Sequence, residues 1–133
     1  MMQKSKIIVG ALLAALANLL GAFGAHALKA RADEATLNTF EIAVKYQFYH
    51  AVGILLLAAL AQQLAAKWLQ YSYRFFIAGT VIFCGSLYLL TYSRVHMPTP
   101  LNWLGAITPL GGICFIAGWV SLAIGAVKNV GSK

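Results

Sequence analysis

The chain has 133 residues, of which 61% are hydrophobic and only 10% charged, and its formal net charge is +7. Soluble domains carry about 25% charged residues, and each helix of a soluble bundle needs a polar face. Too few polar residues are present to coat such helices, so a water-soluble bundle is excluded and apolar surroundings are expected. The positive charge does not indicate a nucleic-acid partner, because the Lys and Arg residues stand at segment ends and form no stripe.

Four hydrophobic segments are long enough to cross a lipid bilayer. The lipid bilayer is therefore the expected partner of the protein's outer surface. A hydrocarbon core of about 30 Å needs about 20 apolar residues in a helix. The sequence therefore predicts an all-α integral membrane bundle in one domain, residues 1–133, with transmembrane helices near 7–27, 46–66, 75–93 and 103–127. The short separator 67–74 is expected to be a loop that makes the second and third helices antiparallel.

The first segment also has features of a secretion signal. Lys4 and Lys6 precede the apolar run, and Ala25-His26-Ala27 near its end has the small-x-small pattern of a cleavage site. The apolar run is longer than the core of a typical signal, so a retained membrane helix is expected.

Orientation follows from the distribution of basic residues. An even number of spans puts both termini on one side, which then holds six Lys or Arg residues against four on the other. Because cytoplasmic loops are enriched in Lys and Arg, the N- and C-termini are predicted to be cytoplasmic.

The separator before the second span is predicted to be an amphipathic helix. Asn38-Thr39-Phe40-Glu41 resembles a capping box, and Glu41 and Lys45 have the favourable i, i+4 order. Its apolar residues recur at steps of three and four, at Leu37, Phe40, Val44 and Phe48. The helix is expected to lie in the membrane interface and to run, or bend, into the second span.

All three histidines and all three acids fall on the side opposite the termini in this topology. One hypothesis is a polar cluster at the outer mouth of the bundle, formed by His26, Glu41, Tyr46, Gln47 and His50. Such a cluster would hold a metal, a haem, a quinone headgroup or a proton, and no single cofactor is indicated. A site requires the His26 and His50 side chains within about 5 Å of each other around a shared pocket.

The alternative for these residues is structural. Histidines near an interface meet water or cap carbonyls, and Gln and Tyr form hydrogen bonds between helices. The chain has no HExxH motif, no paired cysteines and no carboxylate pair at ligand spacing, so the structural interpretation is favoured.

Small residues recur on two of the predicted helices. Gly111, Gly118 and Gly125 repeat every seven residues in the fourth, and Gly21 lies four residues from Ala17 and Ala25 in the first. Small residues let helices approach closely in lipid, where the hydrophobic effect does not drive association. These faces predict either a tightly packed monomer or a homo-oligomer.

Four sequence motifs in order resemble those of a known family. They are Gly21-Ala22-Phe23-Gly24-Ala25-His26, Tyr46-Gln47-Phe48-Tyr49-His50-Ala51, Phe83-Cys84-Gly85-Ser86-Leu87-Tyr88, and Thr108-Pro109-Leu110-Gly111-Gly112 with Gly118-Trp119. Together they are similar to the YgdD/YwdK-like family of small bacterial membrane proteins. The resemblance implies a multi-pass protein of the bacterial inner membrane and implies no activity. It places seven polar or aromatic residues at signature positions: His26, Tyr46, Gln47, His50, Ser86, Tyr88 and Trp119.

Three functional hypotheses follow. The first is a non-enzymatic membrane protein, either an accessory subunit of a membrane-protein partner or an oligomeric scaffold, because packing faces are present and no catalytic constellation is. The second is a small redox, metal or ion-handling protein that uses the histidine cluster. The third and weakest is a pore or transporter based on Asn18, Ser86 and a kink at Pro109.

Overall fold

The computed structural model describes residues 2–130, and every regular element in that range is helical. The elements in chain order are α1 (Met2–Phe23), the π-helix η1 (Gly24–Leu28), α2 (Glu34–Ala59), the short 3₁₀-helix η2 (Ala61–Gln63), α3 (Ala66–Gly79), the π-helix η3 (Thr80–Cys84), α4 (Gly85–His96) and α5 (Leu104–Val130). Because η1 continues α1, and η3 joins α3 to α4, these elements form four rods, each long and apolar enough to span a membrane. The predicted all-α membrane fold is confirmed.

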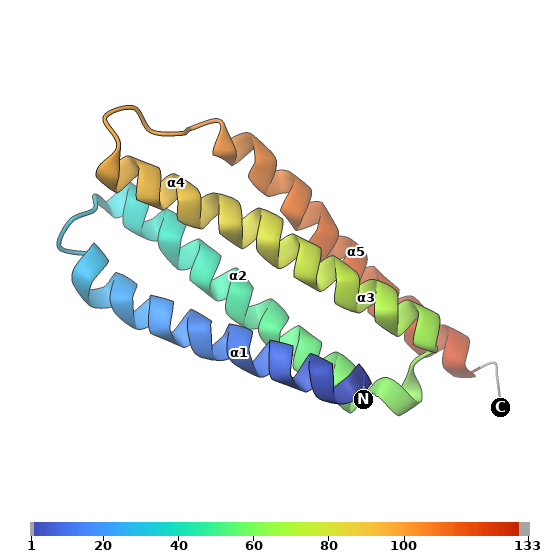
Figure 1. Cartoon of the computed structure of the whole chain (residues 1–133). Helices are drawn as coiled ribbons and strands as arrows, with labels where there is room; N and C mark the ends of the chain where they lie inside the picture. The colour runs from blue at the N-terminus through green and yellow to red at the C-terminus, as the bar shows by residue number, and fades with distance from the viewer. Residues whose placement is uncertain (1, 131–133) are drawn as a thin grey trace.

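Successive rods are antiparallel, and both described ends of the chain lie at the same end of the bundle (Figure 1). The main contacts join α1 to α2, α5 to α3 and η3, and α2 to α4. No extensive contact joins α1 to α4 or α1 to α5 among the described residues, whereas α2 reaches α5 through side chains, with the His50 ring stacked on Phe115. The two hairpins therefore meet mainly through α2, which packs on α4, η3 and α3, and the outer helices leave grooves beside it.

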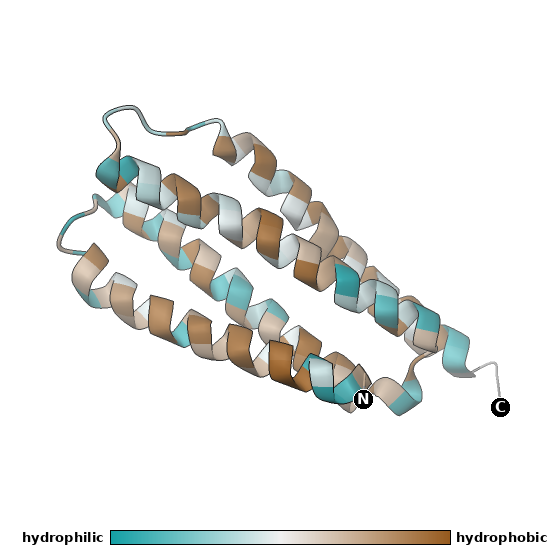
Figure 2. Cartoon of the chain, viewed as in Figure 1, coloured by the Kyte–Doolittle hydropathy of each residue, from teal (hydrophilic) through white to brown (hydrophobic). Residues whose placement is uncertain are grey.

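Hydrophilic residues gather towards the two ends of the rods, and hydrophobic ones cover the lengths between them (Figure 2). Along the rods, large apolar side chains such as Leu12, Val81 and Ile113 are more than 60% exposed. From Arg74 to Arg94, both exposed, there are twenty residues of helix, or about 30 Å. This length matches the hydrocarbon thickness of about 30 Å, so the helix between the two arginines is long enough to cross the bilayer.

The expected loop at residues 67–74 is wrong, because α3 begins at Ala66 and includes all of them. The connection lies at residues 60–65 and is held to α5 by a hydrogen bond from Ala65 N to Gly125 O of 3.0 Å. Leu69 is buried, and the Trp68 side chain lies beside Gly125. The charged residues of this segment therefore belong to a helical turn that extends beyond the hydrocarbon.

The amphipathic stretch before the second span is the first part of α2, which runs to Ala59 without a break. The helix begins four residues before Asn38, and its cap is Asp33, whose Oδ1 accepts from Thr36 N at 2.8 Å. Hydrogen bonding by Thr36, through its side chain and backbone, lowers the pKa of the Asp33 carboxyl. Phe40 and Ala43 are buried, so this part of α2 packs into the bundle.

The predicted packing glycines lie at helix contacts inside the chain. A Cβ on Gly118 would lie 2.5 Å from the Phe76 ring, one on Gly125 3.0 Å from Trp68 Cβ, and one on Gly21 3.5 Å from Val44. At Gly111 a Cβ would collide with the backbone of Phe83. These small residues therefore serve the contacts of a single copy, chiefly those between α5 and the α3–η3–α4 rod.

Replacing Gly111 with alanine is expected to destabilise the fold by about 1–3 kcal/mol, because the Phe83 backbone cannot move aside as a side chain can. The matched control is Gly105→Ala in the same helix, where an added Cβ meets nothing within 4 Å. That control should leave stability unchanged or raise it. The measurement is unfolding of the two purified variants in mixed micelles. Equal stability of the two variants would contradict the packing described here.

Candidate functional site

His50 lies in the middle of α2 and is buried, with its ring stacked on Phe115 at a centroid distance of 3.5 Å. The indole Nε1–H of Trp119 donates to His50 Nε2 at 3.1 Å. Since an indole N–H can only donate, Nε2 is the acceptor and the ring proton is on Nδ1. His50 Nδ1 then donates to Tyr46 O at 2.7 Å. The imidazole is therefore neutral and has both nitrogens engaged.

Gln47 joins three helices through its side-chain amide. Its Nε2 donates to Leu13 O of α1 at 2.9 Å, and its Oε1 accepts from the Tyr88 hydroxyl of α4 at 2.8 Å. The side chain is buried, so these two bonds take the place of hydrogen bonds to water, which the hydrocarbon lacks. Gln47 therefore holds the α1–α2 hairpin against α4.

A groove of about 520 Å³ lies beside this centre, between α2, η3 and α5. It is lined mainly by aromatic rings: Tyr46, Tyr49, Phe83, Phe115 and Trp119, with His50 among them. The Tyr46 ring stacks on Phe83 at 4.5 Å, yet Tyr46 is 38% and Tyr49 55% exposed. Neither tyrosine hydroxyl has a hydrogen-bond partner within residues 2–130.

The other members of the predicted cluster lie elsewhere. His26 is exposed in η1 and Glu41 is exposed on α2. Gly24, close to His26 in the chain, faces the Phe40 ring, and His50 is ten residues further along α2, or about 15 Å. His26 and His50 therefore share no pocket. The reason is that the stretch expected in the membrane interface packs into the bundle as the first part of α2, so His50 lies in mid-helix and not at the outer mouth.

A metal centre has no ready set of ligands in the described part of the chain, which contains no group of three His, Cys, Asp or Glu side chains able to hold an ion. The residues of the pore hypothesis do not line one path. Ser86 bonds Phe83 O and the Thr108 hydroxyl between α4 and α5, whereas Asn18 is exposed in a groove between α1 and α2. Since α1 and α5 do not meet, no single channel includes both.

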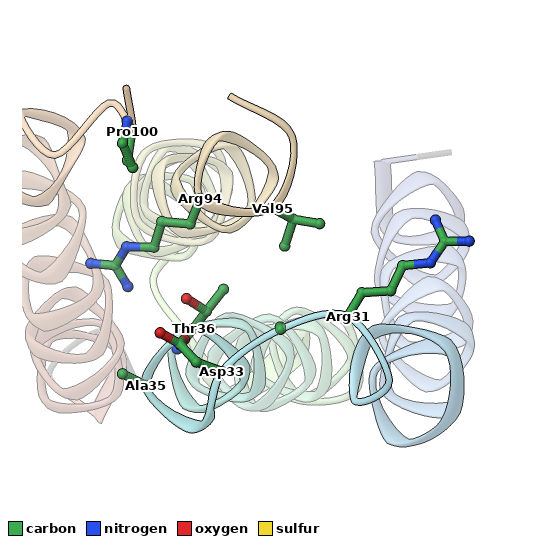
Figure 3. Close-up of a pocket in the computed structure, with 8 residues that line it drawn as sticks. Arg31, Asp33, Ala35, Thr36, Arg94, Val95 and Pro100 are labelled. Carbon is green, nitrogen blue, oxygen red and sulfur yellow. The ribbon is translucent and has the colours of Figure 1, made fainter. Parts of the chain in front are cut away.

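The end of the bundle opposite the termini has a polar pocket lined by Arg31, Asp33, Thr36 and Arg94 (Figure 3). The two guanidinium groups point in opposite directions from it. Arg94 Nη1 donates to Thr39 Oγ1 at 3.2 Å, and Asp33 is turned to Thr36. In the same view α1 and α5 lie on opposite sides of the α2–α4 pair. The pocket therefore does not direct its cations at one ligand.

Comparison with known proteins agrees with this membrane architecture. Residues 20–112 match the family described as "Protein of unknown function (DUF423)". The chain is 41% identical to the UPF0382 membrane protein YwdK of Bacillus subtilis, with 95% of this chain and 98% of the relative covered. It belongs to this family.

Two further relatives extend the comparison. The UPF0382 membrane protein SH2409 of Staphylococcus haemolyticus is 38% identical, with 97% of this chain and all of the relative covered. The UPF0382 inner membrane protein YgdD of Escherichia coli is 37% identical, over 82% of this chain and 79% of its own length. No solved structure matches the chain. The resemblance drawn from the four motifs is thus confirmed, and the chain is a multi-pass membrane protein.

The sequence predicts Tyr46, Gln47 and His50 as members of a polar cluster but does not predict the side chains that contact them. The family resemblance marks Tyr88 and Trp119 as signature positions, and no sequence pattern marks Phe115. The helical period places Phe115 and Trp119 on one face of α5, four residues apart. That spacing was visible in the sequence, whereas the level at which α5 passes α2 was not.

Removing the Tyr88 hydroxyl with Tyr88→Phe is expected to destabilise the fold by about 1 kcal/mol, since the Gln47 carbonyl would lose its donor. Tyr92→Phe, on the same helix, is the control, because Tyr92 is exposed and its hydroxyl has no partner within residues 2–130. Thermal unfolding in detergent would measure both. A loss of stability of the same size in the control would contradict the Gln47 bridge.

Proposed function

We propose that this protein is a non-enzymatic accessory subunit that binds a second membrane-spanning protein through the groove between α2 and α5. The observation that carries the proposal is the pair of unpartnered hydroxyls on Tyr46 and Tyr49. Both residues lie close to the midpoint of α2, which runs from Glu34 to Ala59. Arg94 donates to Thr39 at the outer edge, so Tyr46 lies about 10 Å and Tyr49 about 15 Å along α2 from that edge, inside the hydrocarbon.

An unpaired hydroxyl in hydrocarbon carries a desolvation penalty, since lipid tails cannot accept a hydrogen bond. A neighbouring helix with a backbone carbonyl or polar side chain facing the groove would supply the two acceptors. The aromatic walls would add contact area, and Trp119, 41% exposed, adds the largest ring. A partner helix thus satisfies both the polar and the apolar parts of the groove.

A homo-oligomeric scaffold is less well supported than a different partner. The glycine faces that would serve such an oligomer are used within one chain, at contacts with Phe76, Phe83 and Trp68. The crosslinking experiment distinguishes a second copy of this chain from a different partner protein.

A second candidate is the binding of a small redox molecule, favoured by the position of His50 in the same groove. A quinone headgroup fits best, because its carbonyl oxygens would accept from the Tyr46 and Tyr49 hydroxyls. Metal or haem ligation by His50 would require loss of the Trp119 hydrogen bond. A quinone extracted in stoichiometric amount from the purified protein would support this candidate, and a colourless, metal-free and quinone-free sample would count against it.

The accessory role predicts site-specific crosslinking in native membranes. A photoreactive phenylalanine analogue at Phe83 of η3 or at Ile116 of α5, both in the lining of the groove, should give an adduct with the same partner protein. The control position is Leu12 on α1, which is 66% exposed and lies outside the groove. It should give no adduct with that partner.

The outcomes separate the versions of the proposal. Adducts with a second copy from both groove positions would replace the accessory role by a homo-oligomeric scaffold. Recovery of monomer alone from both positions would remove the accessory and scaffold roles together.

The bias of basic residues supports cytoplasmic termini in a bacterial inner membrane. In a chain with Cys84 and Cys114 replaced by alanine, a membrane-impermeant maleimide should label Asn102→Cys in intact cells. Ser5→Cys should react only after permeabilisation. Both positions are exposed and lie at opposite ends of the bundle, and the reverse labelling would invert the topology.

A further inference from the structure

A second groove, between α1 and α4, differs in chemistry from the one proposed to hold a partner. Its volume is about 450 Å³, within the range of about 300–1,000 Å³ typical of ligand sites. Leu16, Leu20 and Phe23 form the α1 wall, and Tyr88 and Tyr92 the α4 wall. Since α1 packs along α2 and makes no extensive contact with α4, the groove is open to lipid along its length.

The polar groups in the depth of this groove are already satisfied. The Tyr88 hydroxyl donates to Gln47 Oε1 at 2.8 Å, and the Thr91 hydroxyl donates to Leu87 O at 2.9 Å. The groove therefore offers its occupant an apolar surface in its depth, and its one hydroxyl unpaired among the described residues is that of Tyr92, whose ring stacks on His96. From Leu16 to Leu28 it runs along twelve residues, about 18 Å. This is close to the thickness of one leaflet, about 15 Å.

The outer end of the groove is cationic. The groove continues into a second pocket of about 420 Å³, which shares Phe23, Leu28, Val95 and His96 with it and is also lined by Arg31. The His96 ring is held at this mouth by stacking on Tyr92 at 4.5 Å. Figure 3 shows the Arg31 side chain extending over the α1 side, away from Asp33. No acidic residue is among those that line either pocket, so the Arg31 charge is left for an anion.

From this combination we propose that the α1–α4 groove binds a phospholipid with an anionic headgroup. One acyl chain lies along Leu16, Leu20 and Phe23, and the phosphate lies beside the Arg31 guanidinium. Length, apolar lining and a single cationic end match a lipid, whereas a partner helix would have no use for the charge at one end. The site is independent of the accessory role, because it shares no residue with the α2–α5 groove.

The test is native mass spectrometry of the detergent-purified protein with defined lipids. Dioleoyl-phosphatidylglycerol should be retained about fivefold more than dioleoyl-phosphatidylcholine, the contribution expected of one basic residue near an anionic surface. Arg31→Gln should remove this preference. The matched control Arg74→Gln, exposed at the other end of the bundle, should keep it. Both arginines are exposed, so neither change disturbs the packed interior.

Tail length provides an independent arm. Dihexanoyl-phosphatidylglycerol has the same headgroup but chains too short to fill the groove, and it should bind at least tenfold more weakly than the dioleoyl lipid. Equal retention of the two dioleoyl lipids, an equal loss in Arg31→Gln and Arg74→Gln, or equal binding of the short and long lipids would each overturn the proposal. So would a dimer whose interface excludes lipid from this groove.

Discussion

The side-chain amide of Gln47 is the interaction on which the arrangement of the rods depends. Hydrocarbon provides no hydrogen-bond partner, so a buried amide must find both an acceptor and a donor within the protein. Gln47 finds the acceptor on α1, at Leu13 O, and the donor on α4, at the Tyr88 hydroxyl. These two bonds determine how far α1 slides along α2 and which face of α4 meets α2. The close approach of Gly10 on α1 to Leu55 on α2 supports the same register.

A second device fixes the other hairpin. Glycines lie at the closest points of the contact between α5 and the α3–η3–α4 rod: Gly79 faces the Phe115 ring, Gly118 faces the Phe76 ring, and Gly111 faces the backbone of Phe83. The glycines let the backbones approach, and the rings fill the space that the missing side chains leave. His50 stacks on Phe115 and accepts a hydrogen bond from the Trp119 N–H, so the aromatic side chains that pack this hairpin also form the surface that α2 contacts. The same residues therefore pack the helices and form the polar centre, in which His50 accepts a hydrogen bond from a neighbouring helix.

The sequence was sufficient to predict the fold class but not how deep each helix lies relative to its neighbours. Composition and the length of the apolar runs determine that four rods cross a bilayer, since few other structures satisfy that many apolar residues. The loop predicted at residues 67–74 was wrong because charged residues were taken to indicate a loop, whereas α3 remains helical beyond the hydrocarbon. His50 was expected at the outer mouth, whereas the stretch expected in the interface packs into the bundle as the first part of α2 and leaves His50 in mid-helix. The partners Tyr88 and Trp119 follow only from the relative depth of the rods, which no local pattern records.

The two open grooves follow from the same arrangement, in which α1 and α5 lie on opposite sides of the α2–α4 pair. Helix α1 makes no extensive contact with α4 within residues 2–130, and α5 reaches α2 through the Phe115 and Trp119 side chains. The grooves also differ in the hydroxyls that line them. In the depth of the α1–α4 groove Tyr88 and Thr91 donate within the chain, and the one hydroxyl unpaired in the described part of the chain is that of Tyr92, whose ring stacks on His96 at the mouth. In the α2–α5 groove the hydroxyls of Tyr46 and Tyr49 are both unpaired among the described residues, so an acyl chain there would leave two donors unsatisfied inside the hydrocarbon. The hydrogen bonds of the two linings therefore support the proposals of a lipid for one groove and a polar partner for the other, although both grooves are lined mostly by carbon.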